Sequence, residues 1–279
     1  MSGKRDNRID RAFAECRRAG RKALVLFVSA GDPDLETSEQ LIEAIGEAGA
    51  DVVEIGVPFS DPMADGPTIQ AASQRALAGG ATLPKILDMI RRVRRRVEIP
   101  FVLFSYYNVM LNYGLQALAR DSAAAGVDGW LVVDVPAEEA EEVSDVMTEH
   151  NLHRIPLVAP TTPAERIPLL LRCAAGFVYY IAVKGVTGAR AEMAADLESH
   201  IGRIRAVTSL PVVAGFGVSG PESARRTARY ADGVVVGSRL IDIVSGAETP
   251  RQGVEAGRTF VTSLAEALQS PIAAASAQG

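Results

Sequence analysis

Hydrophobic residues recur along this chain in eight short, nearly continuous runs, separated by longer stretches in which apolar and polar positions alternate. Short apolar runs bounded by Gly, Pro and Asp are typical of strands that are buried on both faces. The eight predicted strands cover residues 23–30, 51–56, 99–105, 129–135, 154–159, 176–183, 210–215 and 232–236.

The stretches between these runs place apolar residues three and four positions apart, which is the spacing of an amphipathic helix. An opening helix is predicted over 7–19, and Thr37 or Ser38 would cap the next helix, which ends before Gly49. The remaining predicted helices begin near Thr68 and cover 84–97, 114–125, 137–149, a segment opened by Pro163, 195–208, a segment that begins at about Pro221, and 252–269.

Eight parallel strands that alternate with helices close naturally into a (β/α)8 TIM barrel, here with an additional N-terminal helix. A doubly wound open sheet is the structural alternative, and it predicts a GxGxxG fingerprint in the first turn. The first turn is Gly31-Asp32-Pro33 instead, which favours the barrel. We therefore expect a single barrel domain over residues 1–279, in which the Ala- and Ser-rich segment 270–279 is a disordered tail.

The net charge of −5 argues against a nucleic-acid partner, because a nucleic-acid surface needs a basic face. The one basic cluster, residues 91–96, falls on a predicted helix and is interpreted as a solvated outer face. Residues 23–30 form too short an apolar run for a signal peptide, and no run approaches the ~20 apolar residues of a membrane span. We expect a soluble, cytoplasmic protein that binds no membrane.

The cysteines and histidines show no metal-binding pattern. Cys16 and Cys173 stand far apart without a CxxC partner, and His150, His153 and His200 lack the spacing of metal ligands. We expect no metal site, and the absence of a disulfide pattern fits a reducing compartment.

Glu54 is the most unusual residue of the chain, because it lies inside an apolar run. An isolated charge in such surroundings costs several kcal/mol, or the pKa of the group rises instead. The carboxylate is either half of a structural ion pair with a distant Lys or Arg, or a proton-transfer group tuned by desolvation. Glu54 shares strand parity with Val52 and Gly56, so these three residues are predicted to point to one side, into the barrel.

Polar side chains follow several of the predicted strands, and the C-terminal ends of barrel strands form the active-site face of TIM barrels. The side chains expected to converge there are those of Asp32, Glu54, Asp65, Tyr106, Asp134, Tyr179 and Thr187.

Glycines after the last three strands predict a phosphate site, because they let backbone N–H groups approach an anion. These segments are Gly215-Phe216-Gly217, Gly237-Ser238 and Thr187-Gly188, although such glycines also occur in ordinary turns. The Gly-rich loop 184–190 is either a lid over this site or an ordinary mobile loop.

Residues 53–70, Val-Glu-Ile-Gly-Val-Pro-Phe-Ser-Asp-Pro-Met-Ala-Asp-Gly-Pro-Thr-Ile-Gln, closely resemble the signature of the tryptophan synthase alpha subunit family. The segments 27–33, 134–136, 185–188, 215–217 and 237–238 follow in the order of that family, so the resemblance covers nearly the whole chain. It implies a lyase of tryptophan biosynthesis that cleaves indole-3-glycerol phosphate by a retro-aldol reaction into indole and glyceraldehyde 3-phosphate.

The resemblance also implies roles for single residues. Glu54 would be the catalytic acid and base, and Asp65 a second catalytic carboxylate that binds the indole N–H. The implied binding residues are Phe27, Ile69, Phe104 and Leu131 for an apolar indole slot, Tyr106, Tyr179 and Thr187 near the substrate, and Gly188, Phe216, Gly217, Gly237 and Ser238 for the phosphate. Residues of the apolar slot would look the same if they were only core residues.

The family works with a beta subunit that carries pyridoxal phosphate, so the resemblance implies an alpha2-beta2 heterotetramer and no cofactor on this chain. The loop 58–67 and residues 106–112 are our hypothesis for the docking surface. Two features depart from the family pattern: Val183-Lys184 in the lid replaces the Arg and Ser of some members, and Phe104 replaces a smaller aliphatic residue.

Two other functions remain as alternatives. An enzyme similar to indole-3-glycerol phosphate synthase would carry a lysine on a barrel strand, and no predicted strand interior contains one. A non-catalytic subunit that only activates a partner would have lost a carboxylate or filled the phosphate glycines, and all of these residues are present.

Overall fold

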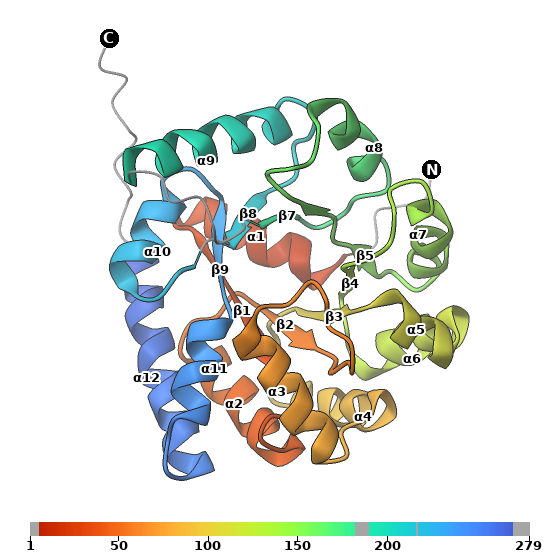
Figure 1. Cartoon of the computed structure of the whole chain (residues 1–279), viewed down its shortest axis with the longest axis vertical. Helices are drawn as coiled ribbons and strands as arrows, with labels where there is room; N and C mark the ends of the chain where they lie inside the picture. The colour runs from red at the N-terminus through yellow and green to blue at the C-terminus, as the bar shows by residue number, and fades with distance from the viewer. Residues whose placement is uncertain (1–5, 182–189, 216, 270–279) are drawn as a thin grey trace.

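The computed structural model describes residues 6–181, 190–215 and 217–269, and the strands in these ranges form one parallel sheet that curls into a barrel (Figure 1). Their order in the sheet is β5-β4-β3-β2-β1-β9-β8-β7-β6. The strands are β1 (Ala23–Ser29), β2 (Val52–Gly56), β3 (Phe101–Ser105), β4 (Gly129–Val132), β5 (His153–Arg154), β6 (Leu157–Val158), β7 (Val178–Ile181), β8 (Val212–Gly215) and β9 (Gly233–Val236).

The strand predicted over 154–159 is interrupted, and its two pieces are β5 and β6. Proline has no N–H to give to a ladder, so a strand breaks at Pro156. The segment still joins both neighbours, because the Ile155 N–H donates to the Trp130 carbonyl and the Tyr179 N–H donates to the Pro156 carbonyl, both at 2.9 Å. Counted with this broken strand, the sheet has the eight strand positions of the predicted TIM barrel.

Helices alternate with the strands around the outside of the barrel (Figure 1). They are α1 (Arg8–Arg18), α2 (Leu35–Glu47), α3 (Pro67–Ala78), α4 (Leu83–Val93), α5 (Tyr107–Tyr113), α6 (Leu115–Ala125), α7 (Ala140–Glu149), a 3-10 turn η1 (Ala164–Arg166) that leads into α8 (Ile167–Leu171), α9 (Arg190–Arg205), α10 (Pro221–Ala228), α11 (Ser238–Ser245) and α12 (Pro250–Gln269). The sequence pattern missed α5 and α11, which are short.

The cap predicted for α2 was wrong. Asp34 precedes the helix in extended conformation, and its carboxylate accepts the Thr37 N–H at 2.7 Å, whereas Thr37 and Ser38 lie inside the helix. Aspartate and serine are both favoured N-cap residues, and Asp34 precedes Thr37 and Ser38, so the helix begins earlier than predicted.

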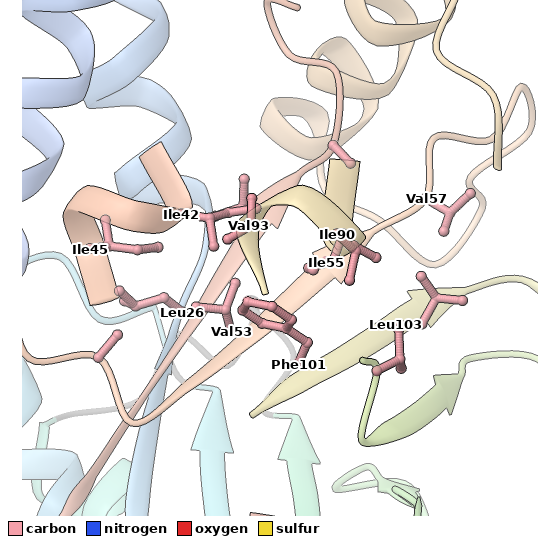
Figure 2. Packing of buried hydrophobic residues seen from close by; sticks show 14 of the residues in the cluster. Leu26, Ile42, Ile45, Val53, Ile55, Val57, Ile90, Val93, Phe101 and Leu103 are labelled. Atoms are coloured by element: carbon pink, nitrogen blue, oxygen red, sulfur yellow. The ribbon is translucent and has the colours of Figure 1, made fainter. Parts of the chain in front are cut away.

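Strand parity divides the core into two clusters. Val53 and Ile55 point outward and pack with Phe101 and Leu103 against Ile42, Ile45, Ile90 and Val93 of α2 and α4 (Figure 2). Val52 points inward and joins Val25, Val102, Leu131 and Val213 in the barrel interior. Val52, Glu54 and Gly56 were predicted to point into the barrel, and this is confirmed for Val52.

The additional N-terminal helix closes one end of the barrel. Phe13 of α1 packs against Phe177, with 5.3 Å between ring centroids, and both belong to the interior cluster. The Asn7 side chain caps α1 by accepting the Ile9 N–H, and it donates to the carbonyls of Asp128 and Asn151. These carbonyls precede β4 and β5, so α1 covers the N-terminal ends of the strands.

The basic cluster on α4 is only partly a solvated face. Arg92 and Arg96 form ion pairs with Glu39 of α2, but the partly buried Arg94 turns inward. Its guanidinium lies 3.9 Å above the Phe101 ring and donates to Asp128 at 3.2 Å. The solvated interpretation was therefore wrong for Arg94, because the carboxylate of Asp128 compensates its charge.

We expect Asp128→Asn to lower the free energy of unfolding by about 3–5 kcal/mol, because the partly buried Arg94 and Arg8 would keep their charges without the buried carboxylate. Asp88→Asn removes the exposed helical partner of Arg91 and serves as the control, with an expected loss of about 0.5 kcal/mol or less. Urea titrations of both variants check this, and equal midpoints would contradict it.

Candidate active site

Glu54 occupies the middle of β2, opposite Phe27 of β1 and Val102 of β3. Its side chain is 0% exposed, and neither carboxyl oxygen has a hydrogen-bond partner. Burial raises the pKa of Glu54 to about 8, so the group is mostly protonated at neutral pH. Within the described residues no Lys or Arg pairs with it, so these residues give no support to a structural ion pair.

Asp65 lies in the loop between β2 and α3, next to the end of β3. The Tyr106 hydroxyl donates to its Oδ2 at 3.0 Å, and the Gln70 side chain donates to its main-chain carbonyl at 2.9 Å. Burial raises the pKa of Asp65, and the hydrogen bond from Tyr106 acts in the opposite direction. The loop therefore holds a second, partly desolvated carboxyl group at the C-terminal end of the barrel.

Tyr179 of β7 is buried close to both acids. Burial raises the pKa of its hydroxyl well above the usual value, and the charges of Glu54 and Asp65 raise it further. A Cβ at Gly215 would lie 2.6 Å from this hydroxyl, so β8 ends in glycine because the tyrosine needs that space. Tyr179 of β7 therefore lies within electrostatic reach of both Glu54 of β2 and Asp65 of the following loop.

An apolar wall adjoins the two acids. The rings of Phe27 and Phe104 meet edge to face with centroids 5.2 Å apart, and Ile69 packs against the same cluster. Gly56 is required here, because a Cβ would approach the Phe27 ring to 2.3 Å. Ile241 of α11 completes the wall, and the sequence analysis missed it because it missed the helix.

Leu131 of β4 is the register partner of Phe104 in β3. It is fully buried in the interior cluster together with Val102 and Tyr179, whereas Phe104 packs against both groups.

The other two acids at the strand ends have structural partners. Asp32 forms a two-pronged ion pair with Arg75 of α3, at 2.7 and 2.8 Å, and Asp134 accepts the Tyr107 N–H at 2.7 Å. They fix α3 and α5 to the barrel. Among the described residues, Asp32 is the one of the four predicted acids that is paired with a cation.

Gly215, Gly217, Gly237 and Ser238 of the predicted phosphate region lie within the described residues. Gly237 is the N-cap of α11 and Ser238 its first residue, so unpaired N–H groups of the helix start at the end of β9. Gly217 has a φ of +50°, a left-handed conformation that favours glycine. Thr187, Gly188, Phe216 and the lid segment 184–189 lie outside the described residues.

Across residues 6–181, 190–215 and 217–269, no group of three or more His, Cys, Asp or Glu side chains could hold a metal ion. Cys16 and Cys173 are free thiols, and burial raises the pKa of Cys16 to about 12. None of the helices in these ranges is long and apolar enough to cross a membrane.

Comparison with known proteins identifies the family. The family model described as "Tryptophan synthase alpha chain" matches residues 13–269. The tryptophan synthase alpha chain of Geobacter sulfurreducens is 52% identical over 262 residues, which cover 94% of this chain and 99% of the relative. That of Caldanaerobacter subterraneus is 45% identical over the same length, covering 94% and 100%.

Solved structures give the same result. The tryptophan synthase alpha chain of Legionella pneumophila superposes with a TM-score of 0.87 at 35% identity, covering 94% of this chain and 97% of the other. A chain of M. tuberculosis tryptophan synthase in its aminoacrylate-bound form gives a TM-score of 0.85 at 34% identity, covering 94% and 100%. With its barrel, its paired carboxyl groups and these relatives, the chain belongs to the tryptophan synthase alpha chain family, the lyases that cleave indole-3-glycerol phosphate.

Proposed function

We propose that Glu54 carries the protons in the cleavage of indole-3-glycerol phosphate by this chain, and that Asp65 stabilises the charge that develops on the indole ring. The observation that carries the proposal is the buried carboxyl group of Glu54, which has no partner and a pKa raised to about 8. Such a group holds a proton at neutral pH and still gives it up readily, as a general acid must.

The reaction needs two proton transfers. Protonated Glu54 first donates its proton to indole C3, which leaves the positive charge of the ring on nitrogen. The resulting carboxylate then removes the proton from the hydroxyl group on the carbon bonded to C3. The electron pair of that O–H bond forms the aldehyde, the C–C bond breaks, and its electrons restore the neutral indole, so Glu54 is protonated again.

Asp65 acts in this scheme as a fixed negative charge. Its carboxylate accepts the indole N–H and lowers the energy of the ring cation between the two transfers. The edge-to-face pair of Phe27 and Phe104, with Ile69, supports this placement because it offers the ring an apolar wall. The phosphate of the substrate binds at Gly217, Gly237 and Ser238, together with Thr187, Gly188 and Phe216.

The partner of this chain is a tryptophan synthase beta subunit, which holds the pyridoxal phosphate, and we infer an alpha2-beta2 assembly in the cytoplasm. The described chain exposes few large apolar side chains, and two of them mark the hypothesised docking surface. Met63 in loop 58–67 is 92% exposed and Leu111 in 106–112 is 52% exposed. Both segments follow strands that end at the active site, so docking there would contact the catalytic loop.

The synthase-like alternative finds no support, because none of the described strands carries a lysine. The alternative of a non-catalytic activator is tested by the first of the following predictions.

We expect Glu54→Gln to reduce indole release from indole-3-glycerol phosphate by at least about 100-fold, because an amide cannot carry the protons. The assay uses the purified chain with and without a beta subunit. Glu98→Gln, an exposed carboxylate before β3, is the matched control and should keep native activity. Unchanged activity of Glu54→Gln would remove Glu54 from the mechanism, and no indole from the native chain with a matched partner would overturn the lyase reaction itself.

Glu54 should also make the chain less stable as pH rises. Its pKa is about 8 in the folded state and ordinarily 4.5, so between these values the folded state keeps a proton that the unfolded state has lost. Its stabilising contribution is complete below about pH 4.5 and lost by about pH 8, a difference on the order of a few kcal/mol. Glutamine does not titrate, so the Glu54→Gln variant should not lose this stability as pH rises. The stability of Glu54→Gln relative to the native chain should therefore be greater at about pH 8 than at about pH 5. Urea midpoints measure this, and a constant difference would contradict the raised pKa.

The double variant Met63→Glu/Leu111→Glu should weaken binding of the beta subunit by about tenfold or more, because the charges replace apolar contact area. Both side chains are exposed, so folding should change by less than about 0.5 kcal/mol. Calorimetric titration checks the affinity, with Val207→Glu as a control that changes another exposed apolar side chain. Equal affinities of the two variants would place the docking surface elsewhere.

A further inference from the structure

Tyr106 follows β3 and holds the loop after β2 with one buried side chain. Its hydroxyl donates to Asp65 Oδ2 and accepts the Ala64 N–H, both at 3.0 Å. Its ring packs on Phe59, with 5.0 Å between centroids. A single side chain therefore contacts the loop near its beginning and at the residue that carries the second carboxyl group.

The two hydrogen bonds fix the direction of the hydroxyl proton. A phenol oxygen donates one bond and accepts others, and accepting the Ala64 N–H leaves the O–H to point at Asp65. Burial and the neighbouring Asp65 raise the pKa of Tyr106, so the hydroxyl keeps its proton. The family resemblance implies that Tyr106 lies near the substrate, and in the structure its hydroxyl is hydrogen-bonded to Asp65 and Ala64 of the loop.

Among the groups that surround Asp65, Tyr106 is the one that donates a hydrogen bond to its carboxylate within the described residues. Glu54 of β2 and Tyr179 of β7 lie close to it from the barrel, and across the described residues only the Tyr106 side chain donates to its carboxylate. A hydroxyl donor orients one oxygen and leaves the charge of the carboxylate in place, whereas a cation would compensate that charge.

We propose that Tyr106 is a positioning residue that holds the Asp65 carboxylate in the orientation the indole N–H requires, without contacting the reacting atoms itself. This rests on the role proposed above for Asp65. Two consequences distinguish it from simple anchoring of the loop. Loss of the hydroxyl should change the rate of the chemical step more than substrate binding, and it should change the pH at which Asp65 becomes ionised.

The test compares Tyr106→Phe with Tyr113→Phe in the full chain, using indole-3-glycerol phosphate as substrate. Tyr113 is the matched control, because its hydroxyl donates to the Asp121 carboxylate at 2.8 Å on α6, away from the barrel mouth. Both substitutions remove one hydroxyl and one hydrogen bond to an aspartate. The phosphate of the substrate titrates identically in all reactions, so differences between pH profiles belong to the protein.

For Tyr106→Phe we expect kcat to fall about tenfold near neutral pH, with KM changed less than about twofold. The hydrogen bond from Tyr106 lowers the pKa of Asp65, so its loss should raise that pKa and move the acid limb of the profile to higher pH. Tyr113→Phe should leave kcat, KM and the acid limb unchanged.

A carbon-13 NMR titration of the Asp65 carboxyl group in both chains separates failure of this inference from failure of the lyase mechanism, because it needs no turnover. Asp65 titrating at higher pH in Tyr106→Phe supports the inference. An unchanged titration, or losses of kcat that leave the acid limb in place, would show that Tyr106 only anchors the loop. An inactive native chain would refute the proposed mechanism, whatever the titration shows.

Discussion

The removal of Glu54 from water is the physical constraint on which this site depends. A carboxyl group at the centre of a barrel strand, 0% exposed and without a hydrogen-bond partner, keeps its proton and so acquires acid chemistry near neutral pH. Any cation within reach would restore the ordinary acidity of glutamate. The neighbouring strands accordingly place valine, phenylalanine and tyrosine around it, and the core contains a polar group without a hydrogen-bond partner, which is the property that the proposed role of Glu54 requires.

At the opposite end of the barrel, the carboxylates are paired with cations. Asp51, Asp128 and Asp232 each precede a strand, and each accepts both an arginine and the N–H of a residue in the neighbouring strand. These paired acids fasten adjacent strands together where α1 closes the barrel. At the C-terminal ends of the strands, by contrast, Asp32 is paired with Arg75, whereas Asp65 accepts a hydrogen bond from the neutral Tyr106 hydroxyl.

Most of the barrel could be predicted from the sequence because both of its signals are local: short apolar runs for strands and helical spacing between them. Pro156 interrupts a strand through its missing N–H, and α5 and α11 are too short for their periodicity to show. The alternation of side chains along β2 was enough to predict that Glu54 points into the barrel. It could not show that Arg94 pairs with Asp128 or that Asp32 pairs with Arg75, because these ion pairs depend on contacts between residues that are distant in sequence. Gly56 and Gly215 could have indicated the position of the site from the sequence. Each is the last residue of a strand, and an aromatic ring fills the space that its side chain would occupy.

The two carboxyl groups differ in what surrounds them, and the difference suits two tasks. Glu54 has no donor, so its proton is available. Asp65 has a hydroxyl donor, which favours its ionised form and leaves a full charge for a substrate N–H. An arginine in place of Tyr106 could not accept the Ala64 N–H and would compensate the charge of Asp65, as Arg75 of α3 compensates that of Asp32. A neutral donor with two bonding directions is thus the side chain that can fix both the loop and its carboxylate while keeping the carboxylate reactive.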